Sequence, residues 1–207
     1  MRRATPEDAA GRGLVAARER AAGRRTLLVA TKVALVALLA GCTSAPSAPP
    51  ANLTACDRVA RVRNAATAPL LPAGPCDLPA FDFATFQQLL SQLHGTPVVV
   101  NVWGSLCGPC IAEAPRLARA ARLYEGRVQF VGVDTNDLRP LARGFILKHG
   151  YPYPSVFDPD RSVLNGLKLR APPDTLIFDA SGKRVFLLPG PITEKILLHE
   201  MAKVTAD

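Results

Sequence analysis

The chain has 207 residues, of which 48% are hydrophobic and 20% charged, so it can bury a core, and disorder throughout is excluded. Its formal net charge is +8, but residues 1–41 hold eight Lys or Arg against three Asp or Glu, which leaves only +3 for residues 42–207. A nucleic-acid binder keeps its basic surface in the folded domain. We therefore expect no nucleic-acid partner.

An export signal is predicted at the N-terminus. A basic stretch runs into the apolar segment Leu27–Ala40, whose 14 residues are too few to span a bilayer, which takes about 20 residues. Such a segment is typical of the hydrophobic region of a secretory signal. The following Leu39-Ala40-Gly41-Cys42 resembles a bacterial lipobox, which implies cleavage before Cys42, its lipidation, and attachment to the extracytoplasmic face of the cell membrane. The alternative is a buried apolar helix with an incidental cysteine.

The composition divides the chain into four parts. We predict a lipoprotein signal peptide at 1–41, a flexible linker rich in Pro, Ser and Ala at 42–55, an N-terminal arm at 56–76, and a folded domain at 77–207. Cys56 and Cys76 lie twenty positions apart, and in an exported protein such a pair is most simply a structural disulfide. The alternative is a second redox pair that relays electrons.

The chemistry is concentrated after the first predicted strand. Val98–Trp103 is an apolar, β-branched run, as in a strand buried on both faces, and Pro109–Tyr124 follows as a helix with Pro109 in its first turn. Cys107 and Cys110 bracket this strand-to-helix turn. Free N–H groups and the helix dipole at the N-terminus favour an anion, so the pKa of Cys107 should fall below its free value of about 8.5. We predict Cys107 as the nucleophile and Cys110 as the resolving thiol.

Other uses of the two cysteines fit poorly. Structural zinc would need a second pair of Cys or His ligands at matching spacing, and the remaining cysteines and the three histidines are scattered. A peroxidatic cysteine would follow a Pro-x-x-x-Thr-x-x-Cys pattern, which Cys107 does not. We expect no metal and no cofactor other than the Cys107–Cys110 disulfide.

The remaining elements follow a β-α-β, helical insertion, β-β-α order of the α/β class. They are a strand at Arg127–Asp134, a helix at Leu138–His149 capped by Thr135 or Asn136 and ended by Gly150, an extended segment at 151–159, a short helix at Arg161–Leu169, a hairpin of strands Thr175–Asp179 and Lys183–Leu188, and an amphipathic helix at Thr193–Val204.

The segment Trp103-Gly-Ser-Leu-Cys107-Gly-Pro-Cys110-x-x-Glu113-x-Pro115 resembles the active site of the thioredoxin-like TlpA/ResA/CcmG family. The resemblance covers roughly residues 77–205 and implies a thioredoxin fold, a central mixed sheet flanked by helices, with a TlpA-type helical insertion. It assigns Cys107 and Cys110 as the redox pair, with Trp103, Gly108 and Pro109 as their support.

Three further positions carry the resemblance. Glu113 matches a carboxylate that tunes the thiols, although a solvated helix residue is the alternative. Pro115 matches a kink in the active-site helix. Pro173 aligns with a cis-proline that faces the redox pair. The chain departs from the family at Leu106, where an aromatic is usual, and has Asn101 where thioredoxin has a buried Asp.

The resemblance implies a membrane-anchored, extracytoplasmic thiol-disulfide oxidoreductase that acts on protein thiols. The thioredoxin dipeptide Gly108-Pro109 favours reduction, since thioredoxin has a potential of about −270 mV against about −120 mV for the oxidant DsbA. Apocytochrome c thiols are then the expected substrate and a membrane protein of the CcdA kind the expected electron donor. The alternatives are an oxidase that introduces disulfides into secreted proteins, and a non-catalytic or metal-chaperone binding module on the same fold.

Overall fold

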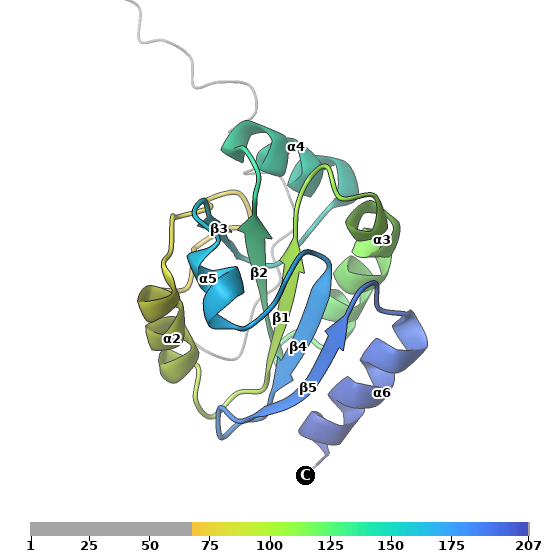
Figure 1. Ribbon diagram of the computed structural model, residues 1–207. Helices are drawn as coiled ribbons and strands as arrows, with labels where there is room; N and C mark the ends of the chain where they lie inside the picture. The colour runs from red at the N-terminus through yellow and green to blue at the C-terminus, as the bar shows by residue number, and fades with distance from the viewer. Residues whose placement is uncertain (1–67, 207) are drawn as a thin grey trace, which may run out of the picture. The chain divides into compact units, whose positions relative to one another are not determined.

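The structure is a computed structural model that describes residues 68–206 (Figure 1). The predicted signal, linker and lipidation site at Cys42, and Cys56, lie outside the described residues. The elements are α2 (Phe83–Gln92), β1 (Val98–Trp103), α3 (Gly108–Leu123), β2 (Gln129–Thr135), α4 (Arg139–His149), β3 (Ser155–Asp158), α5 (Ser162–Gly166), β4 (Asp174–Phe178), β5 (Arg184–Pro189) and α6 (Glu194–Thr205).

A mixed five-stranded sheet in the order β3-β2-β1-β4-β5 forms the centre of the fold. β1 pairs in parallel with β2, and β2 with β3, whereas β4 runs antiparallel to β1 and β5 antiparallel to β4. The crossover helix α3 joins the parallel strands β1 and β2, as parallel pairing requires. This is the topology that the resemblance implies.

Helices cover both faces of the sheet and enclose two apolar clusters (Figure 1). Alternate residues of β1 enter different clusters: Val99 and Trp103 pack with α3, α4 and α6, while Val100 and Val102 pack with α2 and α5. All six residues of β1 are buried, which confirms a strand enclosed on both sides. The end of β1 is therefore a rigid support for the turn that carries the cysteines.

The start of α4 differs from the prediction. The helix begins at Arg139 after Leu138, which makes no side-chain capping bond, so the predicted cap by Thr135 or Asn136 is wrong. Asp137 lies closer to the helix, and its carboxylate accepts a hydrogen bond from the Leu138 N–H at 2.6 Å. The end of α4 is as predicted, because Gly150 takes the left-handed conformation, with φ of 63°.

Two elements were not predicted. The helix α2 begins after Asp82, whose carboxylate accepts from the Thr85 N–H at 2.7 Å, and buries Phe86 and Leu89. The strand β3 lies inside the segment expected only to be extended, and it adds a third parallel strand beside β2. Both elements pack on the core, and the other elements follow in the predicted order.

The segment before α2 packs along the domain. Leu78 is fully buried, and its carbonyl accepts from Arg139 Nε at 3.0 Å. Cys76 is buried and disulfide-bonded; Cys56 lies outside the described residues, so their pairing stays a prediction. Among the helices of residues 68–206, none combines the length and apolar composition needed to cross a membrane.

Candidate active site

Cys107 and Cys110 form a disulfide at the junction of β1 and α3. Cys107 is the N-cap residue of α3, and its sulfur accepts a hydrogen bond from the Cys110 N–H at 3.2 Å. Cys107 is half-buried, whereas Cys110 is fully buried. The sulfur of Cys107 is therefore open to an incoming substrate, whereas that of Cys110 is not. A thiolate formed at Cys107 would lie among the free N–H groups at the N-terminus of α3. This arrangement fits the predicted roles of the two cysteines.

The turn that carries Cys107 is tied to the loop after β2. Asp137 accepts hydrogen bonds from both the backbone N–H and the hydroxyl of Ser105, the latter at 2.8 Å. The same carboxylate accepts from the N–H of Leu138 at the start of α4. Asp137 thus joins the loop after β1 to the loop after β2. Asp137 was not predicted from the sequence, because Ser105 and Asp137 are 32 positions apart.

Trp103 lies directly before this turn and is fully buried. Its indole stacks on Phe145 of α4 at 4.7 Å between ring centroids and meets Tyr151 edge-on at 5.5 Å. Gly132 of β2 leaves room for it, since a Cβ there would lie 2.7 Å from the indole nitrogen. The predicted supporting role of Trp103 is thus a packing role beneath the active-site turn.

Glu113 is fully buried, so the alternative of a solvated helix residue is wrong. It lies three residues after Cys110, on the same buried side of α3. One carboxylate oxygen accepts from the amide of Asn101 in β1 at 3.1 Å, and the other accepts from the N–H of Ile192 at 2.8 Å. The carboxyl group therefore links α3, β1 and the segment before α6.

Burial raises the pKa of Glu113 to about 7, while the hydrogen bonds from Ile192 and Asn101 oppose the rise. Asn101 is held in turn, because its carbonyl oxygen accepts from the hydroxyls of Tyr151 and Tyr153, each at 3.3 Å. Asn101 stands where thioredoxin has a buried Asp, and in this chain a buried acid, Glu113, reaches the same position from α3. At neutral pH, Glu113 can both hold and release a proton.

The Pro172–Pro173 peptide bond is cis, as the resemblance implies for Pro173. The antiparallel register pairs Asp174 with Val102, which sets Pro173 beside the end of β1. Asp174 was not singled out in the sequence, although it directly follows the expected cis-proline. It is 3% exposed, and burial raises its pKa to about 6.

A further buried acid lies below the turn. Asp134 lies in β2 opposite Trp103, and burial, together with the charge of Asp137, raises its pKa to about 9. Asp134 is therefore neutral at pH 7. Asp134 was not predicted from the sequence either, because a lone Asp near the end of a strand does not reveal its burial.

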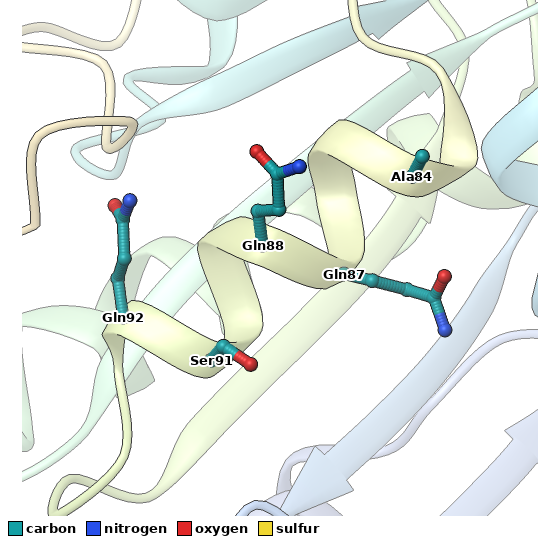
Figure 2. Close-up of a pocket in the computed structure, with 5 residues that line it drawn as sticks. All are labelled: Ala84, Gln87, Gln88, Ser91 and Gln92. Carbon is teal, nitrogen blue, oxygen red and sulfur yellow. The ribbon is translucent and has the colours of Figure 1, made fainter.

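A hollow on the surface at α2 has no suitable chemistry. It measures about 700 Å³ and is lined by five exposed residues of α2, shown in Figure 2: Ala84, Gln87, Gln88, Ser91 and Gln92. None of them is a thiol or an ionisable group. Among residues 68–206, no cluster of three or more His, Cys, Asp or Glu could hold a metal ion.

Known proteins match this chain in sequence and in fold. The model of the family described as Redoxin matches residues 78–197. The thiol-disulfide oxidoreductase ResA of Bacillus subtilis is 31% identical over 109 residues, covering 52% of this chain and 61% of ResA. The thiol:disulfide interchange protein DsbE of Allochromatium vinosum is 34% identical over 142 residues, covering 65% of this chain and 74% of DsbE. The match thus spans about three fifths of the ResA protein.

Solved structures agree on the fold. The dsbF protein of MTB, in mixed oxidized and reduced forms, superimposes with a TM-score of 0.52 at 27% identity, over 56% of this chain and 85% of dsbF. A thiol:disulfide interchange protein DsbE from Chlorobium tepidum gives a TM-score of 0.54 at 22% identity, over 56% of this chain and 85% of its own. At the latter identity the likeness concerns the fold alone, which is the thioredoxin fold expected from the sequence.

Proposed function

Because the chain belongs to the Redoxin family, we propose that it is a thiol-disulfide oxidoreductase that exchanges disulfides with other proteins through Cys107 and Cys110. One observation carries the proposal: a half-exposed sulfur caps α3, bonded to a fully buried second sulfur. Such a pair lets one sulfur meet the substrate while the other is reserved for the resolving step.

In the reducing direction, the thiolate of Cys107 attacks one sulfur of a substrate disulfide. The substrate S–S bond breaks, a mixed disulfide forms, and the first substrate sulfur leaves as a thiolate that takes up a proton. Cys110 then loses its proton and attacks the sulfur of Cys107. The second substrate sulfur leaves, so two electrons have passed from the enzyme dithiol to the substrate.

Glu113 is the acid–base group for the resolving step. It shares the buried side of α3 with Cys110, and burial raises its pKa to about 7. The ionised carboxylate can take the proton of the Cys110 thiol, and the protonated form can return one when the reaction runs backwards. Without Glu113, the buried thiol would have no nearby group of suitable pKa on α3 to receive its proton.

We further propose that the protein works as a reductase on the extracytoplasmic side of a bacterial membrane, anchored by lipid on Cys42. The Gly108-Pro109 dipeptide supports reduction. The ResA and DsbE relatives support a role in thiol-disulfide exchange. The resemblance to the TlpA/ResA/CcmG family implies a substrate among apocytochrome c thiols, and a membrane dithiol donor of the CcdA kind would restore the reduced pair. The alternative is an oxidase that introduces disulfides, for which the same sulfur atoms would serve.

Reduction of insulin disulfides tests the activity. Wild type should accelerate insulin precipitation in the presence of dithiothreitol, Cys107→Ser should not, and Cys110→Ser should accumulate a mixed disulfide with the substrate. Equal rates for wild type and Cys107→Ser would refute the enzyme and favour a binding module. Trapping of thiols in cells tests the direction, because a mostly oxidised Cys107–Cys110 pool would refute the reductase and favour the oxidase.

A further inference from the structure

A pocket of about 290 Å³ lies beside the active-site turn. It is formed by the segment between α5 and β4 together with the end of β5, and its lining residues are Lys168, Leu169, Arg170, Ala171, Pro172, Pro173, Asp174, Leu187, Pro189 and Gly190. In Figure 1, the loop from α5 to β4 lies at the same end of the sheet as the loop from β1 to α3. A Cβ on Gly104 of that turn would lie 4.0 Å from the ring of Pro172. The pocket is therefore a direct neighbour of the disulfide turn.

The rim of this pocket is basic. Lys168 and Arg170 are exposed, and neither forms an ion pair with a residue of the described part of the chain. Arg184 donates to the carbonyl of Leu167 at 3.5 Å, and Arg161 donates to the carbonyl of Arg170, so two more cations lie against the same segment. These four side chains bring a concentration of positive charge to one short loop.

The pocket has a single acidic lining residue, and that residue is buried. It is Asp174, which is 3% exposed and directly follows Pro173 in the chain. The walls include Pro189 and the partly exposed Leu187, whose side chains are apolar. The pocket thus combines an apolar wall with a cationic rim, a combination that suits the aliphatic stem and carboxylate of a Glu or Asp side chain.

We propose that this pocket selects substrate polypeptides that carry Asp or Glu close to the exchanging cysteine. The inference rests on the proposed function, because a polypeptide whose sulfur is bonded to Cys107 must lie across the neighbouring loops. Arg170 offers a planar fork to a carboxylate, and Lys168 adds a point charge beside it. An anionic membrane surface could also bind these two cations, but because it is flat it would not fill the pocket beside them.

Peptides with a single cysteine, held as a mixed disulfide with neutral mercaptoethanol, provide the test. The cysteine is flanked by Glu, by Gln or by Lys, and each peptide is mixed with the pre-reduced full chain. Acid quenching and mass spectrometry give the second-order rate constants. Each constant is divided by that of dithiothreitol with the same peptide, which removes the effect of the flanking charge on the intrinsic reactivity of the disulfide.

We expect normalised rates in the order Glu, Gln, Lys, with about a tenfold span at low salt that shrinks severalfold between about 20 mM and about 300 mM salt. The double variant Lys168→Gln/Arg170→Gln should bring the Glu and Lys peptides close to equal rates. The matched control Lys148→Gln/Lys195→Gln removes the same charge from exposed positions on α4 and α6 and should keep the span.

Each contrary result has a distinct meaning. Equal normalised rates in the wild type would refute the inference while the proposed function stands, whereas no exchange with any peptide would refute both. Loss of the span in the control variant would show that net charge, and not this pocket, is responsible. Equal peptide rates together with binding of phosphatidylglycerol vesicles that only the pocket variant loses would assign the surface to lipid. If the double variant does not fold, the single variant Arg170→Gln should still narrow the span of rates while the control Lys148→Gln/Lys195→Gln keeps it, and an unchanged span in Arg170→Gln would refute the inference.

Discussion

The buried carboxyl group of Glu113 predicts a specific dependence of stability on pH. Its folded-state pKa is about 7, raised by burial from an ordinary value of 4.5. The folded state therefore disfavours the ionised form. The stability associated with the protonated form is fully present below about pH 4.5 and is lost as the pH rises to about 7. The difference of about 2.5 units corresponds to roughly 3 kcal/mol at 25 °C.

Glu113→Gln should remove this dependence. The substitution keeps the shape of the side chain, and its carbonyl oxygen can still accept from Ile192, but it would face Asn101 with an amide, which adds a constant cost at all pH values. The wild type should lose roughly 3 kcal/mol of unfolding free energy relative to this variant between about pH 4.5 and pH 7.5, and the difference should then level off.

Urea unfolding of both proteins, with the Cys107–Cys110 disulfide intact, measures the difference at each pH. Keeping the disulfide closed prevents thiol titration from contributing. The control variant Gln87→Glu places a carboxyl on the exposed side of α2, visible in Figure 2, and its difference from wild type should not change over this range. A constant difference between wild type and Glu113→Gln from about pH 4 to pH 8 would refute the assignment of Glu113 as a buried acid with a raised pKa.

Three more predictions concern the support of the active-site turn. Asp137→Ala should lower the unfolding free energy by about 1–3 kcal/mol and slow exchange at Cys107, and a double-mutant cycle with Ser105→Ala should show coupling, whereas additive effects would contradict the contact. Asp134→Asn should gain stability relative to wild type as the pH rises from about 4 to about 9, which urea unfolding would show and a pH-independent difference would exclude. Gly132→Ala should cost about 1–3 kcal/mol and shift Trp103 fluorescence, because the added Cβ would collide with the Ser155 hydroxyl and with the indole; an unchanged midpoint and spectrum would count against it.

Local patterns predicted the redox centre well. The apolar run of β1 and the proline at the start of α3 fixed where the cysteines lie, and the left-handed Gly150 marked the end of α4. These features depend on neighbours within a few positions. The resemblance supplied Pro173 and Glu113, which no local pattern would have assigned to the site.

The rest depends on contacts between distant segments. Ile192, which binds Glu113, is 79 positions away from it, and Asp137 meets Ser105 over 32 positions. The burial of an acid such as Asp174 results from the pairing of strands and cannot be inferred from the residues next to it in the sequence. The strand β3 was missed for a related reason, because four residues among prolines become a strand only when β2 offers them a partner. The helix α2 could have been found from Asp82 and the apolar spacing of Phe86, Leu89 and Leu93.

The unequal exposure of the two sulfurs also bears on oxidative damage. A peroxide that reaches the reduced site meets Cys107 first and converts its thiolate to a sulfenic acid. The shielded thiol of Cys110 then condenses with it, releasing water and forming the disulfide before further oxygen can be added. The burial of Cys110 thus keeps irreversible sulfinic and sulfonic products away from the resolving position, and any donor of two electrons restores the centre.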